Sequence, residues 1–186
     1  MRLFVALEIS DGIRATISEM TRELQPLDDS WKWTRAANLH VTLKFLGEFA
    51  EEKMPAAIEL LRGVPAEFPI PLKFQSLGFF PNERRPRVLW VGLDAPRGLW
   101  KLAMAIDESM AKLGVARENR EFSPHLTLAR GGEGNLAGKA REAISKRASN
   151  VFGEMGASSF HLIKSELKST GAEYTTLESF SGGSKS

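Results

Sequence analysis

Apolar positions along the chain follow two periods, and each period occurs twice. Short apolar runs at Leu3–Leu7 and Val88–Leu93 have the length of buried strands, and an acidic residue follows each run. After each run, apolar residues recur every three or four positions, which is the spacing of one face of an amphipathic helix. These two faces consist of Ile13, Ile17, Met20 and Leu24, and of Leu99, Ala103, Ile106 and Met110. We expect Asp11 to cap the first helix and Gly114 to end the second.

The two halves of the chain match each other in order and spacing. Leu3-Phe4-Val5-Ala6-Leu7-Glu8 resembles Leu89-Trp90-Val91-Gly92-Leu93-Asp94, 86 positions later. His40-Val41-Thr42-Leu43 resembles His125-Leu126-Thr127-Leu128, 85 positions later. Matching elements in one order indicate a duplicated strand–helix–strand unit, with copies near residues 1–86 and 87–180.

The rest of the pattern completes an α+β fold. It predicts a helix over Glu51–Arg62, a strand over Pro69–Phe79, a turn over 81–86, a helix over Leu136–Ser149, strands over Ser158–Leu167 and Glu173–Phe180, and a flexible Gly/Ser tail over 181–186. We therefore expect a single bilobed domain over residues 1–180. Its two lobes, each an antiparallel sheet with packed helices, are expected to be related by a pseudo-twofold axis and to enclose a cleft.

Composition narrows the chemistry. The 186 residues include no cysteine and three histidines, which excludes disulfides, thiol nucleophiles and cysteine-ligated zinc. The formal net charge of +2 excludes a polybasic tail but allows a local basic patch. The longest apolar runs have five or six residues, whereas a membrane span needs about 20, and the N-terminus lacks a signal-peptide pattern. We expect a cytoplasmic monomer with no membrane partner.

The candidate chemistry lies in the two His-x-Thr sequences. Side chains alternate along a strand, so His40 and Thr42 share one face, as do His125 and Thr127. If the two units face each other, these four side chains converge on one centre. Two imidazoles with ordinary pKa values near 6.5 suit an acid–base pair, and phosphodiester chemistry needs such a pair together with hydroxyl donors. Arg130 adds a charged donor; its odd spacing from His125 predicts that it lies beyond the strand end, where glycines permit a turn.

These motifs carry a resemblance to a known family. The chain resembles the 2H phosphoesterase superfamily and, within it, the RNA 2′,3′-cyclic phosphodiesterases, also called 2′-5′ RNA ligases. The resemblance rests on residues 38–48 and 124–130, with weaker agreement at 2–6, at 85–92 and after Ser165. The sequence departs from the expected apolar strand continuation at Gly131-Gly132-Glu133-Gly134, which affects one edge of the cleft.

The resemblance implies a function and a role for each residue. It implies hydrolysis of RNA 2′,3′-cyclic phosphate ends, or of small cyclic nucleotides, to 2′-phosphomonoesters without a metal, ATP or another cofactor. By motif position, His40 is the proton donor to the departing 3′ oxygen and His125 is the proton acceptor from water. Thr42, Thr127 and Arg130 would bind the phosphate. The reverse reaction would join a cyclic phosphate end to a 5′-hydroxyl end through a 2′-5′ linkage.

Several further residues have two interpretations. Lys44 and Phe45 follow the first motif and would reach a phosphate or stack on a base, but the spacing of Phe45 from His40 directs it toward the core. Tyr174 would reach the cleft or remain outside it. The arginines near Pro86 would clamp an RNA backbone or form a solvated turn; they are Arg84, Arg85 and Arg87.

For the other aromatic and imidazole side chains, a structural role is favoured. Trp31 and Trp33 precede the first motif on one face, which favours core packing, and His161 lies outside the repeat. The alternative to an enzyme is a non-catalytic module that binds RNA ends through the same phosphate pocket. A metal hydrolase is disfavoured, since the sequence has no His-Glu-x-x-His motif and no clustered Asp and His.

Overall fold

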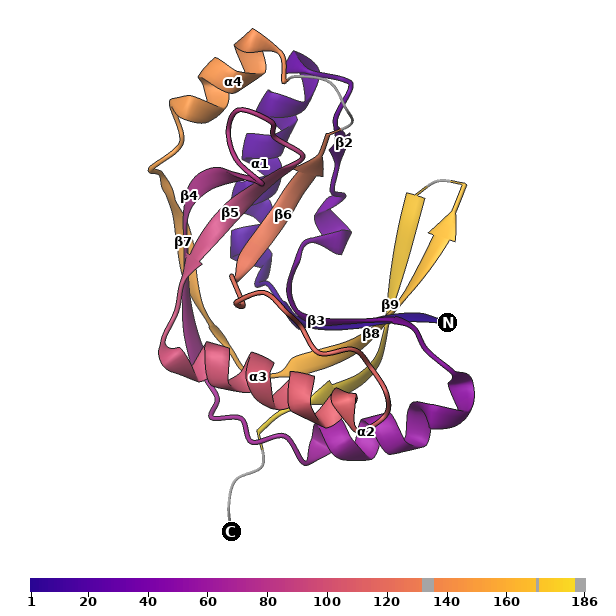
Figure 1. The fold of residues 1–186 in the computed structure, drawn as a ribbon. Coiled ribbons are helices and arrows are strands. Elements are labelled where there is room, and N and C mark those ends of the chain that lie inside the picture. Colours follow the sequence, from indigo (N-terminus) through magenta and orange to yellow (C-terminus); the bar gives the residue numbers. More distant parts are fainter. Residues whose placement is uncertain (132–135, 170, 183–186) are drawn as a thin grey trace.

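A computed structural model of the chain describes residues 1–131, 136–169 and 171–182 (Figure 1). Its strands are β1 (Arg2–Glu8), β2 (Lys32–Trp33), β3 (His40–Glu48), β4 (Ile70–Phe80), β5 (Val88–Asp94), β6 (His125–Arg130), β7 (Val151–Ala157), β8 (Phe160–Lys168) and β9 (Gly171–Phe180). Its α-helices are α1 (Asp11–Leu24), α2 (Met54–Arg62), α3 (Arg97–Ala111) and α4 (Gly138–Ser145). Short 3₁₀ turns η1 (Gln25–Leu27), η2 (Ala36–Asn38) and η3 (Glu51–Lys53) connect them.

The described strands form one sheet with two symmetric halves. The strand order is β7-β4-β5-β6-β3-β1-β8-β9, with β2 beside β6, and these neighbouring strands pair in antiparallel orientation. At the centre, β3 and β6 meet only where Val41 pairs with Leu126. Counted outward from this seam, the repeated strands occupy equivalent positions: β3 and β1 in one lobe correspond to β6 and β5 in the other. The predicted α+β bilobed fold with pseudo-twofold symmetry is confirmed.

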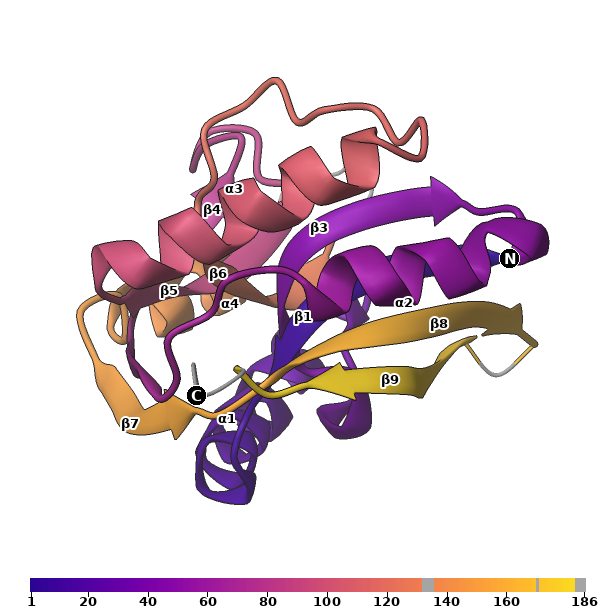
Figure 2. The same ribbon diagram turned by 90° about the horizontal axis from the view of Figure 1, so that it is seen from below.

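Each lobe of the sheet is built from strands of both repeated units. Strand β4 belongs to the first unit in sequence but pairs with β5 and β7 of the second, whereas β8 and β9 of the second unit pair beside β1. Helix α1 packs on β7, while α3 packs on β3 and beside α2 (Figures 1 and 2). Each lobe therefore contains chain from both units, which ties the two lobes together through backbone connections.

The predicted apolar faces form the core, with one difference at the start of α1. The side chains of Ile13 and Ile17 are buried, as are the later members of both helical stripes. Ser10, rather than Asp11, is the N-cap: Ser10 has extended backbone angles, and its hydroxyl oxygen accepts from the Ile13 N–H at 3.3 Å. Asp11 is instead the first helical residue, where a carboxylate favours the positive end of the helix dipole.

The other helix boundaries largely agree with the sequence pattern. The predicted helix over Glu51–Arg62 begins with the turn η3, and the predicted helix over Leu136–Ser149 is shorter, as α4. After α3, Gly114 adopts a positive φ of 85°, and the Val115 N–H donates to the Met110 carbonyl at 3.3 Å.

Strands β2 and β7 were not predicted from the sequence. Two glycines interrupt the alternation in β7, and Gly153 packs so closely on α1 that an added Cβ would lie 2.7 Å from Ile13 Cδ1. The turn proposed at Gly131-Gly132-Glu133-Gly134 extends beyond the described residues at 132, and the end of the predicted tail lies outside them from residue 183.

Candidate active site

The two motif histidines lie at the first residue of the two central strands, β3 and β6. His40 Nδ1 is 2.7 Å from the Asn38 carbonyl, and His125 Nδ1 is 2.7 Å from the Ser123 carbonyl. A carbonyl only accepts hydrogen bonds, so both Nδ1 atoms carry a proton and donate it. In each neutral imidazole, Nε2 is consequently the atom that can accept a proton. His40 Nε2 already lies 2.9 Å from the Thr42 hydroxyl, which donates to it.

A β-bulge interrupts the alternation at the same point of both motif strands. In β3, Val5 pairs with Lys44 and Ala6 with Thr42, so Leu43 is an extra residue. In β6, Leu89 pairs with Ala129 and Trp90 with Thr127, so Leu128 is extra. A bulge reverses the face on which the following residues lie. The residue five positions after each histidine, which strict alternation would place on the opposite face, therefore lies on the face that carries the histidine and the threonine.

In β3, this bulge exchanges the expected positions of Lys44 and Phe45. Phe45 pairs with Phe4 on the face of Thr42 and is 59% exposed, so the expectation that it points toward the core is wrong. Lys44 is buried instead, and the interpretation that it reaches a substrate is wrong. Its Nζ lies 2.6 Å from Asp107 Oδ1 and donates to the Ala116 carbonyl at 2.7 Å.

In β6, the bulge directs Arg130 to the face of His125. Arg130 is the last residue of the strand and pairs with Val88 and Lys32, so the prediction that it lies beyond the strand end is wrong. The following Gly131 donates its N–H to the Arg87 carbonyl at 2.9 Å. Its missing side chain also matters, because an added Cβ would lie 2.6 Å from the buried Trp31 indole.

The electrostatic environment favours neutral imidazoles. Burial lowers the pKa of His40 below its ordinary value, the Asn38 carbonyl opposes this shift, and the charges of His125, Arg130 and Arg14 add to it. Burial also lowers the pKa of His125, against the Ser123 carbonyl, and Arg130 lowers it further. The pKa values of both histidines respond to the charge of Arg130, as expected for a cation that serves both halves of one site.

Aromatic side chains enclose each histidine, but differently. The His40 ring lies 4.7 Å from that of Phe4 and 5.4 Å from that of Tyr174, so Tyr174 does contact the motif histidine. The His125 ring meets the Phe80 ring edge-on at 4.9 Å, and Phe80 packs against Trp90 at 5.2 Å. Sequence reasoning did not assign roles to Phe4, Phe80 or Trp90. The repeat contained part of the signal, since Phe4 and Trp90 occupy equivalent positions in its two copies.

The remaining candidates lie away from the two imidazoles or in the core. His161 is buried in β8, with its ring nitrogens 3.1 Å from the Ser159 hydroxyl and 2.9 Å from the Ser179 hydroxyl. Trp33 is half-buried against the core, in agreement with a packing role. The Asn82 side chain accepts the backbone N–H groups of Arg84 and Arg85, which makes this exposed loop a capped turn, with Arg87 also exposed.

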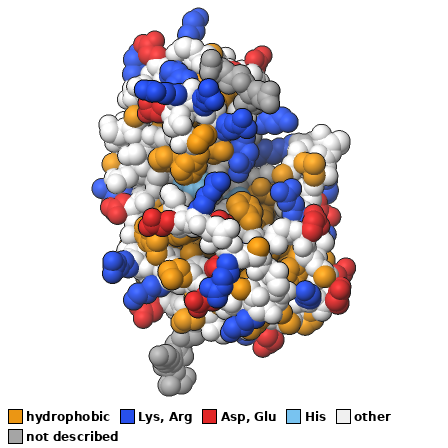
Figure 3. Space-filling view, in the orientation of Figure 1, with side chains coloured by type: hydrophobic (Ala, Val, Ile, Leu, Met, Phe, Trp, Pro, Cys, Tyr) orange, Lys and Arg blue, Asp and Glu red, His pale blue; other side chains and the backbone are white. Residues whose placement is uncertain are grey.

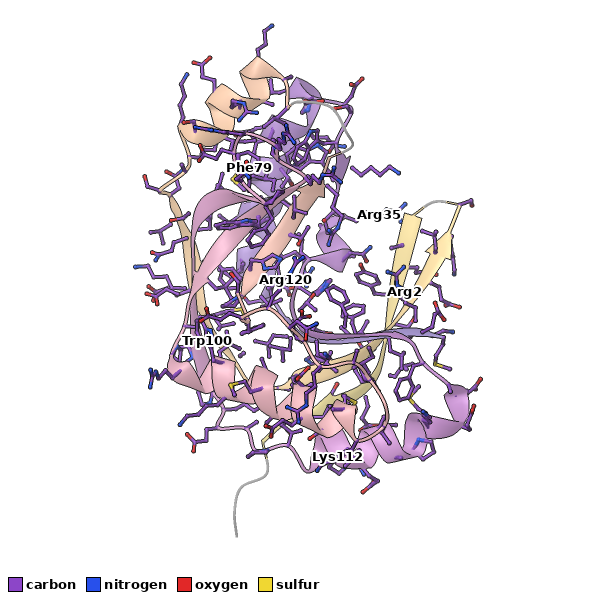
Figure 4. All side chains as sticks on the ribbon, in the orientation of Figure 1. Arg2, Arg35, Phe79, Trp100, Lys112 and Arg120 are labelled. Carbon is purple, nitrogen blue, oxygen red and sulfur yellow. The ribbon has the colours of Figure 1, made fainter. Side chains whose placement is uncertain are left out.

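Basic side chains gather around the concave face of the molecule. Figure 3 shows a histidine in a hollow of this face, with lysine and arginine side chains along its edges. Figure 4 shows Arg2, Arg35 and Arg120 on the same side of the ribbon, coming from three different segments. Among the described residues, no group of three His, Cys, Asp or Glu side chains has the proximity needed to hold a metal ion. No helix in the described segments is long and apolar enough to cross a membrane.

Comparison with known proteins identifies the duplicated unit. A family model described as LigT-like phosphoesterase matches the chain twice, over residues 7–90 and 91–174. The chain belongs to the LigT-like phosphoesterase family. A relative from Archaeoglobus fulgidus named RNA 2′,3′-cyclic phosphodiesterase is 37% identical over 180 residues, covering 97% of this chain and 99% of the relative. A Thermus thermophilus relative of the same name is 35% identical, covering 97% and 90%.

Solved structures support the same assignment of this LigT-like phosphoesterase. TT0787 of Thermus thermophilus has a TM-score of 0.81 at 32% identity, covering 97% of each chain. Escherichia coli LigT complexed with 3′-AMP has a TM-score of 0.80 at 27% identity, covering 98% of each chain. The similarity thus extends over both lobes and over the seam between them.

Proposed function

We propose that this protein hydrolyses RNA 2′,3′-cyclic phosphodiester ends to 2′-phosphomonoesters by acid–base catalysis between His40 and His125. One observation carries the proposal: both imidazoles donate Nδ1–H to the carbonyl two residues earlier, at the same distance, and so leave Nε2 as the atom for proton transfer. A core or surface histidine has no need of such a matched pair at the seam of two lobes. The family assignment and the names of the relatives support the same activity.

Each histidine has one proton to move. His125 Nε2 takes a proton from water while the water oxygen forms a bond to phosphorus. His40 Nε2–H gives a proton to the 3′ oxygen as the P–O3′ bond breaks, which leaves the phosphate on the 2′ oxygen. The attacking and leaving oxygens lie on opposite sides of phosphorus. The leaving ribose therefore belongs to the β3 lobe and the attacking oxygen to the β6 lobe.

Three side chains on the same face bind the phosphate oxygens in this proposal. The hydroxyls of Thr42 and Thr127 donate to non-bridging oxygens, and Arg130 supplies the charged donor. In the free protein, the Thr42 hydroxyl occupies His40 Nε2, so substrate binding replaces that contact. A phosphate anion beside both imidazoles also raises their pKa values from the lowered values of the free site, which restores the protonated acid.

The terminal nucleoside fits the β3 lobe. Phe45 is exposed on the face of His40 and lies 6.1 Å from Phe4, ring to ring, so one of its faces is available to a nucleobase. The same site would run in reverse when a 5′-hydroxyl replaces water, giving a 2′-5′ linkage. The strained cyclic ester supplies the free energy, so no nucleotide activation is needed.

The test is an assay in EDTA with an RNA that carries a 2′,3′-cyclic phosphate, with 2′- and 3′-phosphate products resolved by chromatography. We expect a 2′-phosphate product at a rate that EDTA does not change. A 3′-phosphate product would contradict the assignment of His40 to the 3′ oxygen. Tight binding of the cyclic end with no product would instead support the RNA-end binding module.

A further inference from the structure

A groove on the β6 lobe lies beside the imidazole assigned to the attacking oxygen. It has a volume of about 430 Å³ and is lined by Trp90, Gly92, Trp100, Glu121, Phe122 and Ser123, among others. This volume is within the range of small-molecule sites, about 300–1,000 Å³. None of these six residues belongs to the His-x-Thr motifs or to the phosphate-binding set proposed above.

The groove shares residues with the immediate surroundings of His125. Trp90 pairs with Thr127, and Gly92 pairs with His125, so both lie on the face of β5 that continues the motif face of β6. The Ser123 carbonyl that accepts from His125 Nδ1 belongs to a residue of the groove wall. The groove therefore begins at the loop that anchors His125 and continues along the motif face of β5, next to the strand that carries His125 and Thr127.

The lining suits a flat, uncharged ring. Trp90 lies against Gly78, where an added Cβ would be 2.2 Å from its indole, and an added Cβ at Gly92 would lie 3.2 Å from the same ring. Trp100, in the first turn of helix α3 (Figure 4), donates its indole N–H to the Phe122 carbonyl at 3.0 Å, and the two rings meet edge-on at 6.0 Å. Aromatic walls of this kind stack with nucleobases of any sequence.

The charge of the groove disfavours a phosphate as its main occupant. Glu121 is the charged residue of the lining and is exposed at its rim. A carboxylate there disfavours a 5′-phosphorylated end, whereas a nucleoside with a free 5′-hydroxyl brings no opposing charge.

We propose that this groove is the acceptor subsite: it binds the nucleoside whose 5′-hydroxyl takes the place of water. The inference rests on the proposed function, because it uses the assignment of His125 to the attacking side. The 5′-hydroxyl gives its proton to His125 Nε2 as the O5′–P bond forms. The P–O3′ bond breaks, and His40 protonates the 3′ oxygen, so atoms and charge balance.

The experiment measures how the enzyme divides a nucleoside 2′,3′-cyclic phosphate between water and an added acceptor. Adenosine is the acceptor with a base, and methanol is the acceptor without one; chromatography resolves the dinucleoside phosphate, the methyl ester and the 2′-monoester. We expect adenosine to capture the phosphate about tenfold better than methanol at equal concentration, from stacking alone. Trp100→Ala and Phe122→Ala should each remove most of that preference and leave hydrolysis and methanol capture unchanged.

The control variant is Met104→Ala, one turn further along α3 at an exposed position. It should keep the preference of the original protein. Hydrolysis of the cyclic mononucleotide by each variant shows that the variant is folded.

Three results would overturn the acceptor subsite. Adenosine capture no better than methanol, with hydrolysis intact, removes the subsite but not the proposed function. If the groove variants instead slow hydrolysis of a dinucleotide cyclic phosphate more than that of a mononucleotide, the groove holds the upstream nucleotide of the donor. If the original protein hydrolyses no cyclic phosphate, the proposed function fails and the acceptor subsite fails with it.

Discussion

The two motif strands have the same backbone geometry, but they present different side chains beyond the bulge. Both β3 and β6 begin with a histidine anchored to a carbonyl two residues earlier, and both contain a bulge after the threonine. Beyond the bulge, the residue returned to the motif face is Phe45 in one strand and Arg130 in the other. The residue turned into the core is Lys44 in one and Ala129 in the other. Both repeats therefore share the same anchored histidine geometry, while the positions after each bulge differ.

The largest effect is expected from removing the feature that both strands share, the imidazole at the start of each strand. His40→Ala and His125→Ala should each lower kcat by about 10²- to 10⁴-fold, the usual contribution of general acid–base catalysis. In a pH–rate profile, His125→Ala should lose the acidic limb, which reports the base, and His40→Ala the basic limb, which reports the acid. If both variants lost the same limb, the division of roles between the two strands would be wrong.

The diverged position after the bulge gives the next largest effect. Arg130→Ala removes the proposed charged phosphate donor and should lower kcat/KM by about 10²- to 10³-fold, as for other preorganised donors at a transition state. Phe45→Ala, at the equivalent position of β3, is the matched comparison. It should raise KM with little change in kcat, because stacking holds substrate and transition state equally. Equal losses in kcat from both variants would contradict the proposed division of tasks.

The buried side of the bulge should affect stability rather than chemistry. Lys44→Met leaves Asp107 without its ion pair in a largely buried position and should lower the free energy of unfolding by about 3 kcal/mol, measured by urea titration. The control is Lys53→Met, which removes an exposed lysine whose Nζ donates to the Leu113 carbonyl at 2.9 Å. It should cost less than about 1 kcal/mol. A similar loss from both variants would show that burial of Lys44 contributes nothing particular.

The limits of prediction from sequence follow from the same bulges. Short-range periodicity was enough to find the repeated strands, the helices and the two His-x-Thr pairs, because these patterns depend on neighbours in the chain. The faces of Lys44, Phe45 and Arg130 could not be predicted, since one inserted residue reverses the alternation. The inserted residues, Leu43 and Leu128, are ordinary strand residues, so the sequence does not indicate where the bulges lie. The exchange of β4 and β8 between lobes likewise depends on pairings between residues far apart in sequence.

The smallest expected effect is on the pH dependence of the free energy of unfolding, which can be compared between variants of the two histidines. Their folded pKa values are lowered, so on acidification the unfolded chain binds protons first, below about pH 6.5. The stability that the neutral imidazoles provide is thus complete above about pH 6.5 and declines as the pH falls below that value. His40→Asn and His125→Asn should each reduce this decline in urea unfolding. The reduction should be larger for His40, because its deeper burial and the charge of His125 disfavour its cation. Buried His161, whose pKa is also lowered by burial, maintains a residual slope in both variants. An unchanged slope in His40→Asn would mean that burial of this imidazole does not oppose its protonation, and the greater enclosure of the β3 half of the site would then have no electrostatic consequence.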